Sequence, residues 1–295
     1  MFGAMLQIYD KALLTSALAL AVLASPSLAD TDDPASGAAA VCDLSDGYSA
    51  SALAFAHEAT ACVAADAGTT EIAASLVALT DRAREKNGMA PLASRDSLGA
   101  AATAHAMDMA ARGYASHSDT QGLGHADRVR ILDRSAIFGA MGANVTVVDA
   151  RLDGIAIHNA LMADPVNAEN MARGAFTHGG VGMAEANGER YIVQLFAQID
   201  GELETPLPVA LPRVAGFDVA FADDGFDLAG WRLEDNAGLR VRSGTINRFQ
   251  RRGKETGQLS LAIEAVSDDQ VHTLKGPIMD ADAPLAAGAE RAPGS

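Results

Sequence analysis

Apolar residues recur at helical spacing through the middle of the chain. In residues 72–83 they lie three or four positions apart, which predicts an amphipathic helix that Gly88 and Pro91 end. The same spacing predicts further helices over residues 96–112, 126–134 and 153–162, with a loop over residues 114–124.

The pattern changes to alternation near residue 180. Val181 and Met183 alternate with glycine and alanine, and apolar residues alternate again up to Ile199. Asn187-Gly188 between the two runs is a dipeptide typical of tight hairpin turns. We therefore expect a β-hairpin at the end of this domain, and helices packed on a small sheet make an α/β fold built in layers.

The character of the chain changes again after Gly201. Three prolines between residues 206 and 212 mark a linker. Short stretches with a strand pattern follow, separated by Gly, Asp and Asn, at residues 217–221, 231–234, 239–242, 259–266 and 271–274. We expect a small β-rich C-terminal module over residues 201–280 and a disordered tail over residues 281–295.

The N-terminus has the pattern of an export signal. Lys11 precedes an uncharged apolar run over residues 12–24, and Ser27-Leu28-Ala29 places small residues where signal peptidase cleaves. A signal peptide over residues 1–29 predicts a periplasmic or secreted protein. The run is shorter than the roughly 20 apolar residues of a spanning helix, and no second long run follows, so we expect no membrane span after cleavage. An uncleaved N-terminal anchor is the alternative.

Two cysteines follow the signal. Cys42 and Cys62 have no other cysteine to compete for pairing, and an oxidising compartment favours one disulfide between them. Their spacing fits neither a zinc site nor a redox pair. We therefore expect residues 30–68 to form a segment held by this disulfide.

The charge balance limits the choice of partners. Lys plus Arg is 22 and Asp plus Glu is 38, so the net charge is 22 − 38 = −16. A surface of that sign repels nucleic acid and anionic lipid headgroups, and we expect no nucleic-acid partner. Residues 248–254 are the one basic cluster, read as a solvated turn or, alternatively, as a contact for an acidic partner or anionic polymer.

Several blocks within residues 71–199 resemble one family when taken in order. They are LVALTDRAREKNGMAPL, LGAAATAHAMDMAARGYASH, GHADRVR, FTHGGVGMA and GERYIVQLFAQ. This set resembles the bacterial form of the CAP superfamily, the SCP-like domains of cysteine-rich secretory type. The resemblance implies an α-β-α sandwich over residues 69–200, followed here by the β-rich module.

In many members of that family a cavity with two His and two acidic residues holds a divalent metal. His117 matches the first cavity His. The family's Gly-Glu-Asn is Gly-Ala-Asn here, ending at Asn144, so its carboxylate is missing. The second cavity His is replaced by Asn167, and His178 stands where bacterial members usually carry an acidic residue.

We therefore expect no bound metal and no cofactor. The residues expected to line a cleft or bind a ligand are His117, His125, His178, Asn144 and Asn167. His125, His158 and His178 are the other histidines that could rebuild a metal site beside His117, although no spacing requires it. His105 lies on an apolar helix stripe, which favours a buried, hydrogen-bonded side chain.

The expected function is that of an exported, non-enzymatic protein that binds a small ligand or a cell-envelope component. The resemblance implies a broad range of ligands, including lipids, sterols, metals and envelope partners. A metal-dependent or hydrolytic, protease-like enzyme with a rebuilt His site is the alternative, and a purely structural spacer is a third. No Gly-x-Ser-x-Gly sequence supports a serine nucleophile.

Overall fold

The computed structural model describes residues 42–65 and 70–285. All of the described residues belong to one compact unit. The predicted signal peptide, the start of the 30–68 segment and the end of the predicted tail lie outside the described residues. Within the described ranges, no helix is both long and apolar enough to cross a membrane.

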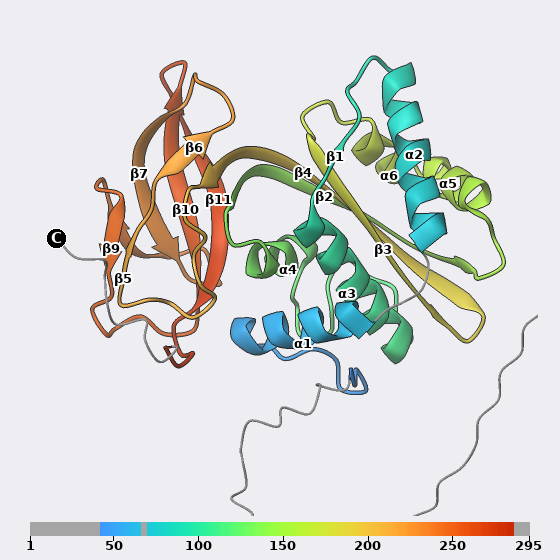
Figure 1. Cartoon of the computed structure of the whole chain (residues 1–295), viewed down its shortest axis with the longest axis horizontal. Coiled ribbons are helices and arrows are strands. Elements are labelled where there is room, and N and C mark those ends of the chain that lie inside the picture. Colours follow the sequence, from blue (N-terminus) through green and yellow to red (C-terminus); the bar gives the residue numbers. More distant parts are fainter. Residues whose placement is uncertain (1–41, 66–69, 286–295) are drawn as a thin grey trace, which may run out of the picture. The chain divides into compact units, whose positions relative to one another are not determined.

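A layered sandwich forms the first part of the fold. Its middle layer is a sheet in which four strands follow one another in the order β1 (Ala93–Ser94), β3 (His178–Ala186), β4 (Glu189–Leu203) and β2 (Ala136–Asp149) (Figure 1). The hairpin of β3 and β4 is antiparallel and turns at Asn187 and Gly188, which both have positive φ. This confirms the predicted hairpin.

Helices cover both faces of this sheet. Helices α2 (Thr70–Lys86), α5 (Gly154–Ala163) and α6 (Pro165–Met171) share one apolar cluster with strand residues such as Ile192 and Phe196. Helices α3 (Asp96–Arg112) and α4 (His125–Leu132) share another with Val193 and Leu195. Since successive residues of a strand point to opposite faces, the two clusters lie on opposite sides of the sheet. The fold is the predicted α-β-α sandwich.

Strand β2 and helix α6 are among the elements that were not predicted from the sequence. Strand β2 lies inside the sheet, between β4 and β11, and its glycines and doubly covered faces hide any alternation. Helix α6 begins where α5 ends: the Asp164 carboxylate accepts from the backbone N–H groups of Val166 and Asn167, and Pro165 occupies the first turn. The Asp-Pro pair that predicts a helix end therefore also starts the next helix.

The N-terminal segment is bonded to the rest of the fold. The disulfide between Cys42 and Cys62 is present, which confirms the predicted pairing. Helix α1 (Ala52–Ala65) buries Phe55 completely, in a cluster that includes Ile131 of α4 and Ile278 near the end of the described chain.

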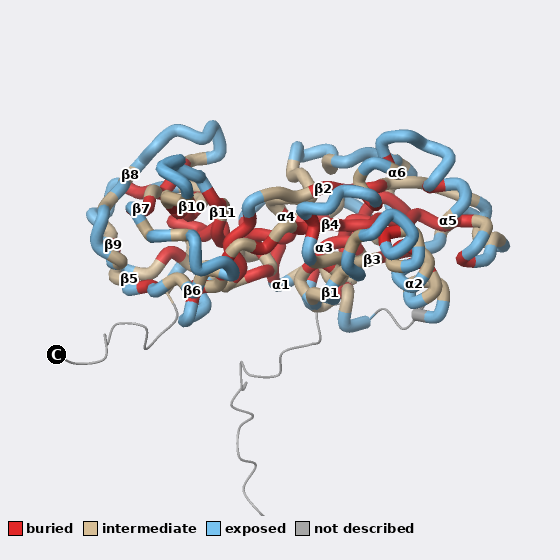
Figure 2. The backbone as a smooth tube through the Cα atoms, turned by 90° about the horizontal axis from the view of Figure 1, so that it is seen from above, coloured by how far each residue is buried: buried red, intermediate tan, exposed pale blue. Residues whose placement is uncertain are grey.

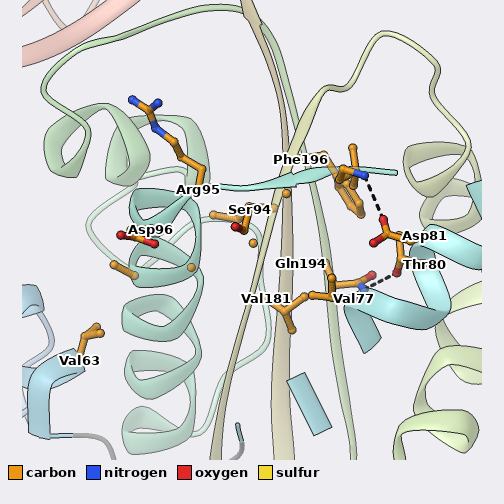
Figure 3. A pocket seen from close by; sticks show the side chains of 16 residues that line it. Val63, Val77, Thr80, Asp81, Ser94, Arg95, Asp96, Val181, Gln194 and Phe196 are labelled. Atoms are coloured by element: carbon orange, nitrogen blue, oxygen red, sulfur yellow. Dashed lines mark hydrogen bonds between the residues drawn. The ribbon is translucent and has the colours of Figure 1, made fainter. Parts of the chain in front are cut away.

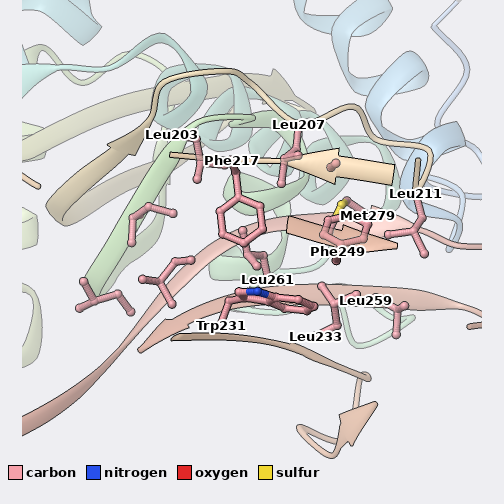
Figure 4. Packing of buried hydrophobic residues seen from close by; sticks show 14 of the residues in the cluster. Leu203, Leu207, Leu211, Phe217, Trp231, Leu233, Phe249, Leu259, Leu261 and Met279 are labelled. Atoms are coloured by element: carbon pink, nitrogen blue, oxygen red, sulfur yellow. The ribbon is translucent and has the colours of Figure 1, made fainter. Parts of the chain in front are cut away.

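Seven strands make up the described C-terminal part of the fold. They are β5 (Val214–Gly216), β6 (Val219–Phe221), β7 (Asp227–Glu234), β8 (Arg240–Gly244), β9 (Arg248–Gln250), β10 (Gln258–Ser267) and β11 (Gln270–Asp280). Most of them continue the sheet of the sandwich, whereas β5 and β9 pair with each other in a separate two-stranded sheet. Strand β11 pairs antiparallel with β2 at Lys275 and Phe138, and β10, β7 and β8 follow in that order. Phe217, Trp231 and Phe249 form the aromatic centre of this part (Figure 4).

Strand β4 runs through the expected domain boundary at residue 200 to Leu203, where it pairs with β6. The division of the chain into separately folding segments stays a prediction.

Arg130 of α4 and Arg134, just after this helix, join the sandwich to the C-terminal strands. Arg130 donates to the Gly276 carbonyl (2.7 Å), and Arg134 donates to the carbonyls of Leu207 (2.8 Å) and Ile278 (2.8 Å). Burial lowers the pKa of both guanidinium groups to about 10, so both stay charged at neutral pH. Buried positions concentrate in this region, from α3 and α4 to β10 and β11 (Figure 2).

Candidate functional site

The residues expected to line a cleft lie in three places. His117, on the loop after α3, and His125, the first residue of α4, are neighbours, with ring centroids 6.3 Å apart. His117 is exposed. Burial lowers the pKa of His125, and His117 and Arg128 lower it further. In the described part of the chain, no three His, Cys, Asp or Glu side chains are grouped to hold a metal ion.

Asn144 of β2 and Asn167 of α6 lie together in a hydrogen-bonded network, apart from the two histidines. Asn144 is fully buried and donates to the Asn167 carbonyl (3.1 Å) and the Gln194 side-chain oxygen (3.2 Å). Asn170 donates in turn to the Asn144 side-chain oxygen (2.9 Å). The network ties α6 to the central strands, and Gln194 extends it to Thr80 of α2 (3.3 Å).

His178 begins β3, apart from both groups. Its Nδ1 is 2.8 Å from the Thr177 hydroxyl, whose oxygen also accepts from the Ile199 backbone N–H (3.2 Å). Burial and, after it, the nearby Arg95 lower the pKa of His178. The Thr177 hydroxyl is thus held by the β4 backbone, which is a poor arrangement for a nucleophile.

A cleft of about 500 Å³ opens elsewhere, between α2 and α3 across the start of β3 (Figure 3). Its lining is mostly apolar and none of the five expected residues contributes to it. The apolar side chains are Val63, Val77, Leu92, Ala100, Val181, Leu195 and Phe196. Thr80, Asp81, Ser94, Arg95, Asp96 and Gln194 supply the polar groups.

Glycines allow α3 and β3 to approach each other closely beside the cleft. Gly179 and Gly180 of β3 and Gly99 of α3 line the cleft without side chains. A β-carbon at Gly180 would lie 2.4 Å from the Gly99 backbone nitrogen, and one at Gly182 would lie 2.0 Å from the Thr103 nitrogen. Helix α3 can therefore pack directly on the β3 backbone. The Gly-Gly-Val-Gly sequence before the hairpin was the available signal for this cleft.

The one cation in the cleft is already paired. Arg95 donates to both Asp133 oxygens (2.8 and 3.0 Å) and also binds Glu202. Burial pushes the pKa of Asp133 up, but its hydrogen bonds from Arg95, Ser97 and the backbone outweigh burial and hold that pKa below its usual value. Arg95 is thus neutralised by two carboxylates. Asp81 and Asp96 remain at the cleft and make its polar part acidic.

A second buried charge cluster lies behind the His117 loop. Arg128 is fully buried, with one guanidinium nitrogen 3.2 Å from an Asp119 oxygen. Asp108 pairs with Arg112 on the same helix (2.6 Å). His105 donates from Nε2 to the Ser116 carbonyl (2.7 Å) and is almost fully buried, as its position on an apolar stripe predicted.

Comparison with known proteins identifies the sandwich. Residues 77–196 match the family model described as CAP, the cysteine-rich secretory protein family. This segment is a CAP domain. No curated protein matches the chain at a significant level.

The CAP domain is also similar to solved structures. An outer surface protein of Borrelia burgdorferi is 18% identical with a TM-score of 0.41, covering 45% of this chain and 96% of its own. An extracellular SCP-domain protein of Bacillus anthracis is 24% identical with a TM-score of 0.38, covering 43% and 40%. A cysteine-rich secretory protein of Staphylococcus aureus is 17% identical with a TM-score of 0.35, covering 45% and 40%.

Ala143 and Asn167, which stand where the family carries metal ligands, lie in different surroundings in the CAP domain. Ala143 is buried in the apolar cluster on the α3 side, whereas the adjacent Asn144 points to the α6 side. Asn167 is nearly buried, and its carbonyl is taken by Asn144. The residues present therefore do not fit a divalent metal with the family's ligand set, since no third His, Cys, Asp or Glu side chain is grouped with His117 and His125 in the part of the chain that the structure describes.

Proposed function

We propose that this is an exported binding protein whose CAP domain takes an elongated apolar ligand in the cleft between α2 and α3. The observation that carries the proposal is the cleft itself. Its volume of about 500 Å³ lies in the range of small-molecule sites, and its walls are apolar with a few polar groups at known positions. Export rests on the predicted signal peptide and is supported by the disulfide.

Binding is favoured over turnover because four of the six polar side chains that line the cleft already have partners. Thr80 accepts from Gln194 (3.3 Å), Asp81 accepts from the Leu92 backbone N–H (3.0 Å), and Arg95 is shared between two carboxylates. Groups held in this way can orient a ligand and are poorly placed to exchange a proton with it.

The charges of the cleft select the polar end of the ligand. Asp81 and Asp96 line the cleft, and the charge of Arg95 is neutralised by its two carboxylate partners. A carboxylate or phosphate on the ligand would therefore meet uncompensated negative charge. An uncharged end, such as a hydroxyl that can bond Ser94 or Asp96, fits better. The ligand class is therefore a long-chain or polycyclic alcohol rather than a fatty acid.

Binding of N-phenyl-1-naphthylamine, an uncharged apolar fluorophore, tests this proposal. We expect one probe per chain, displaced by 1-dodecanol at least about tenfold more effectively than by dodecanoate, because like charge repels the carboxylate. Val77 lines the cleft and is 39% exposed, so Val77→Glu should abolish binding without unfolding the helix.

Ala78→Glu is the matched control, since Ala78 is the next residue of α2, is exposed and does not line the cleft. Equal binding by wild type and Val77→Glu would overturn the proposal. So would preferential displacement by dodecanoate.

The alternative function is a rebuilt metal site, and one observation bears on it. The rings of His117 and His125 lie edge to face with centroids 6.3 Å apart and would supply two of the three or four ligands of a zinc site. A calorimetric titration with zinc distinguishes this function from the first, because His117 and His125 do not line the cleft.

A further inference from the structure

The basic residues of this acidic chain are unevenly distributed. Of its 22 Lys and Arg residues, six lie within residues 239–254, and this stretch contains no Asp or Glu. They are Arg240, Arg242, Arg248, Arg251, Arg252 and Lys254. The screening length in physiological salt is about 8 Å, so a surface this concentrated acts by its own charge and not by the charge of the whole chain. We call residues 239–254 the basic edge.

The fold holds the basic edge at the rim of the sheet. Strand β8 is the last strand of the sheet order and pairs only with β7, so its other side is open. Strands β8 and β9 lie mostly at the surface (Figure 2). The open side of the strand and the loop after β9 are therefore both accessible.

The buried carboxylate of Glu255 contacts several residues of the basic edge. Glu255 is 5% exposed and accepts from the backbone N–H groups of Arg252 (3.0 Å) and Lys254 (3.1 Å). It also lies 3.4 Å from the guanidinium of Arg242 on β8. Burial raises the pKa of Glu255, but these backbone and guanidinium contacts outweigh it and keep the carboxyl ionised. The loop is thereby fixed beside β8.

Most of the basic side chains are left without partners. Among the described residues, the side chains of Arg240, Arg248, Arg252 and Lys254 contact no acidic group and are exposed. The Glu255 carboxylate thus holds the loop and β8 together but neutralises little of the positive charge of the basic edge. Free guanidinium and ammonium groups of this kind pair with phosphate oxygens.

Exposed apolar side chains accompany the charges. Leu239 is 66% exposed, Val241 44% and Ile246 77%. Val241 alternates with Arg240 and Arg242 along the open strand, so its side chain lies on the opposite face of the sheet from theirs, while all three residues belong to the same open edge. A soluble polyanion would use only the charges, whereas the boundary between lipid headgroups and acyl chains uses both kinds of side chain.

We propose that the basic edge docks the protein on an anionic lipid bilayer, with its arginines and lysine on the phosphates and Leu239, Val241 and Ile246 at the acyl boundary. The net charge of −16 argues against such a partner only if charge is averaged over the whole surface. This proposal is independent of the cleft between α2 and α3, because no residue of the basic edge lines that cleft.

Vesicle cosedimentation tests the proposal on the mature protein. We expect at least about tenfold more protein bound to vesicles of equal parts phosphatidylglycerol and phosphatidylcholine than to pure phosphatidylcholine, with binding weakened by salt. Arg240→Glu combined with Lys254→Glu should remove this binding. Arg82→Glu combined with Lys86→Glu is the matched control, since both residues are exposed on α2 and the charge change is the same.

Ile246→Ser adds a test of the apolar contribution. We expect it to weaken binding severalfold while leaving the salt dependence unchanged, because the side chain is exposed and carries no charge. The proposal is overturned if the wild type does not prefer anionic vesicles, or if the control pair loses as much binding as the basic-edge pair. An unaffected Ile246→Ser variant would overturn it in favour of a soluble polyanion.

Discussion

Gly99 of α3 and Gly180 of β3 meet backbone to backbone at the cleft. A β-carbon at Gly180 would lie 2.4 Å from the Gly99 nitrogen and 2.5 Å from the Leu98 carbonyl carbon, whereas one at Gly99 would have no atom within 4 Å. The contact is therefore asymmetric: the strand needs its glycine, and the helix does not.

This asymmetry predicts opposite effects of the same substitution. Gly180→Ala should destabilise the fold by about 1–3 kcal/mol, because backbone atoms cannot move aside easily. Gly99→Ala should stabilise it by about 0.5–1 kcal/mol, because alanine loses less backbone entropy in a helix. Urea unfolding measures both, and two changes of the same sign would contradict the packing described here.

The buried His105 predicts a pH dependence of stability. Burial, followed by the charge of Arg128, lowers its pKa to about 4, from an ordinary value near 6.5. Below pH 6.5 the His105 side chain binds a proton in the unfolded chain, but in the folded chain it stays neutral until the pH approaches 4. The folded state should therefore lose up to about 3 kcal/mol of stability between pH 6.5 and 4 and none from this group above pH 6.5.

Urea unfolding at several pH values, for wild type and His105→Gln, measures this contribution. The difference in unfolding free energy between the two proteins should narrow as the pH falls from 6.5 to 4. A difference that stays constant over that range would show that His105 titrates equally in both states.

The disulfide predicts a stability contribution. Cys42 and Cys62 are 20 residues apart, and closing a loop of this size contributes about 3 kcal/mol. A Cys42→Ser/Cys62→Ser double variant should unfold at lower temperature by calorimetry. A reductant should lower the midpoint of the wild type and leave that of the variant unchanged. An equal shift in both proteins would contradict the assignment.

Zinc titration separates the two functions proposed for the domain. We expect no binding in the micromolar range, because a zinc site needs three or four ligands and His117 has only His125 beside it. Heat corresponding to one ion per chain, absent in His117→Ala, would instead establish a rebuilt metal site and call for hydrolase assays.

The sequence predicted the elements whose signals are local. Helix α3 has the predicted bounds, Asp96 to Arg112, because a left-handed Gly113 ends it. The turn at Asn187-Gly188 was also predicted. Strand β2 was not, because both of its faces are covered and its period is hidden.

The candidate site was harder to predict because glycines, which have no side chains, line part of the cleft. Family positions pointed to His117, Asn144 and His178, and the structure places these on different elements, with no hydrogen bond joining them among the described residues. The cleft instead lies beside the contact between Gly99 and Gly180, residues about 80 positions apart in the sequence. Sequence spacing gives no account of an empty volume between such elements.

Methyl NMR during a titration with 1-dodecanol tests whether an apolar ligand binds between α2 and α3. We expect saturable shifts of the Val77, Leu92, Val181 and Leu195 methyl groups, with Ile246 and Val271 unchanged because they lie outside the cleft. Shifts confined to Ile246 and Val271, or no shifts at all, would contradict the proposed binding.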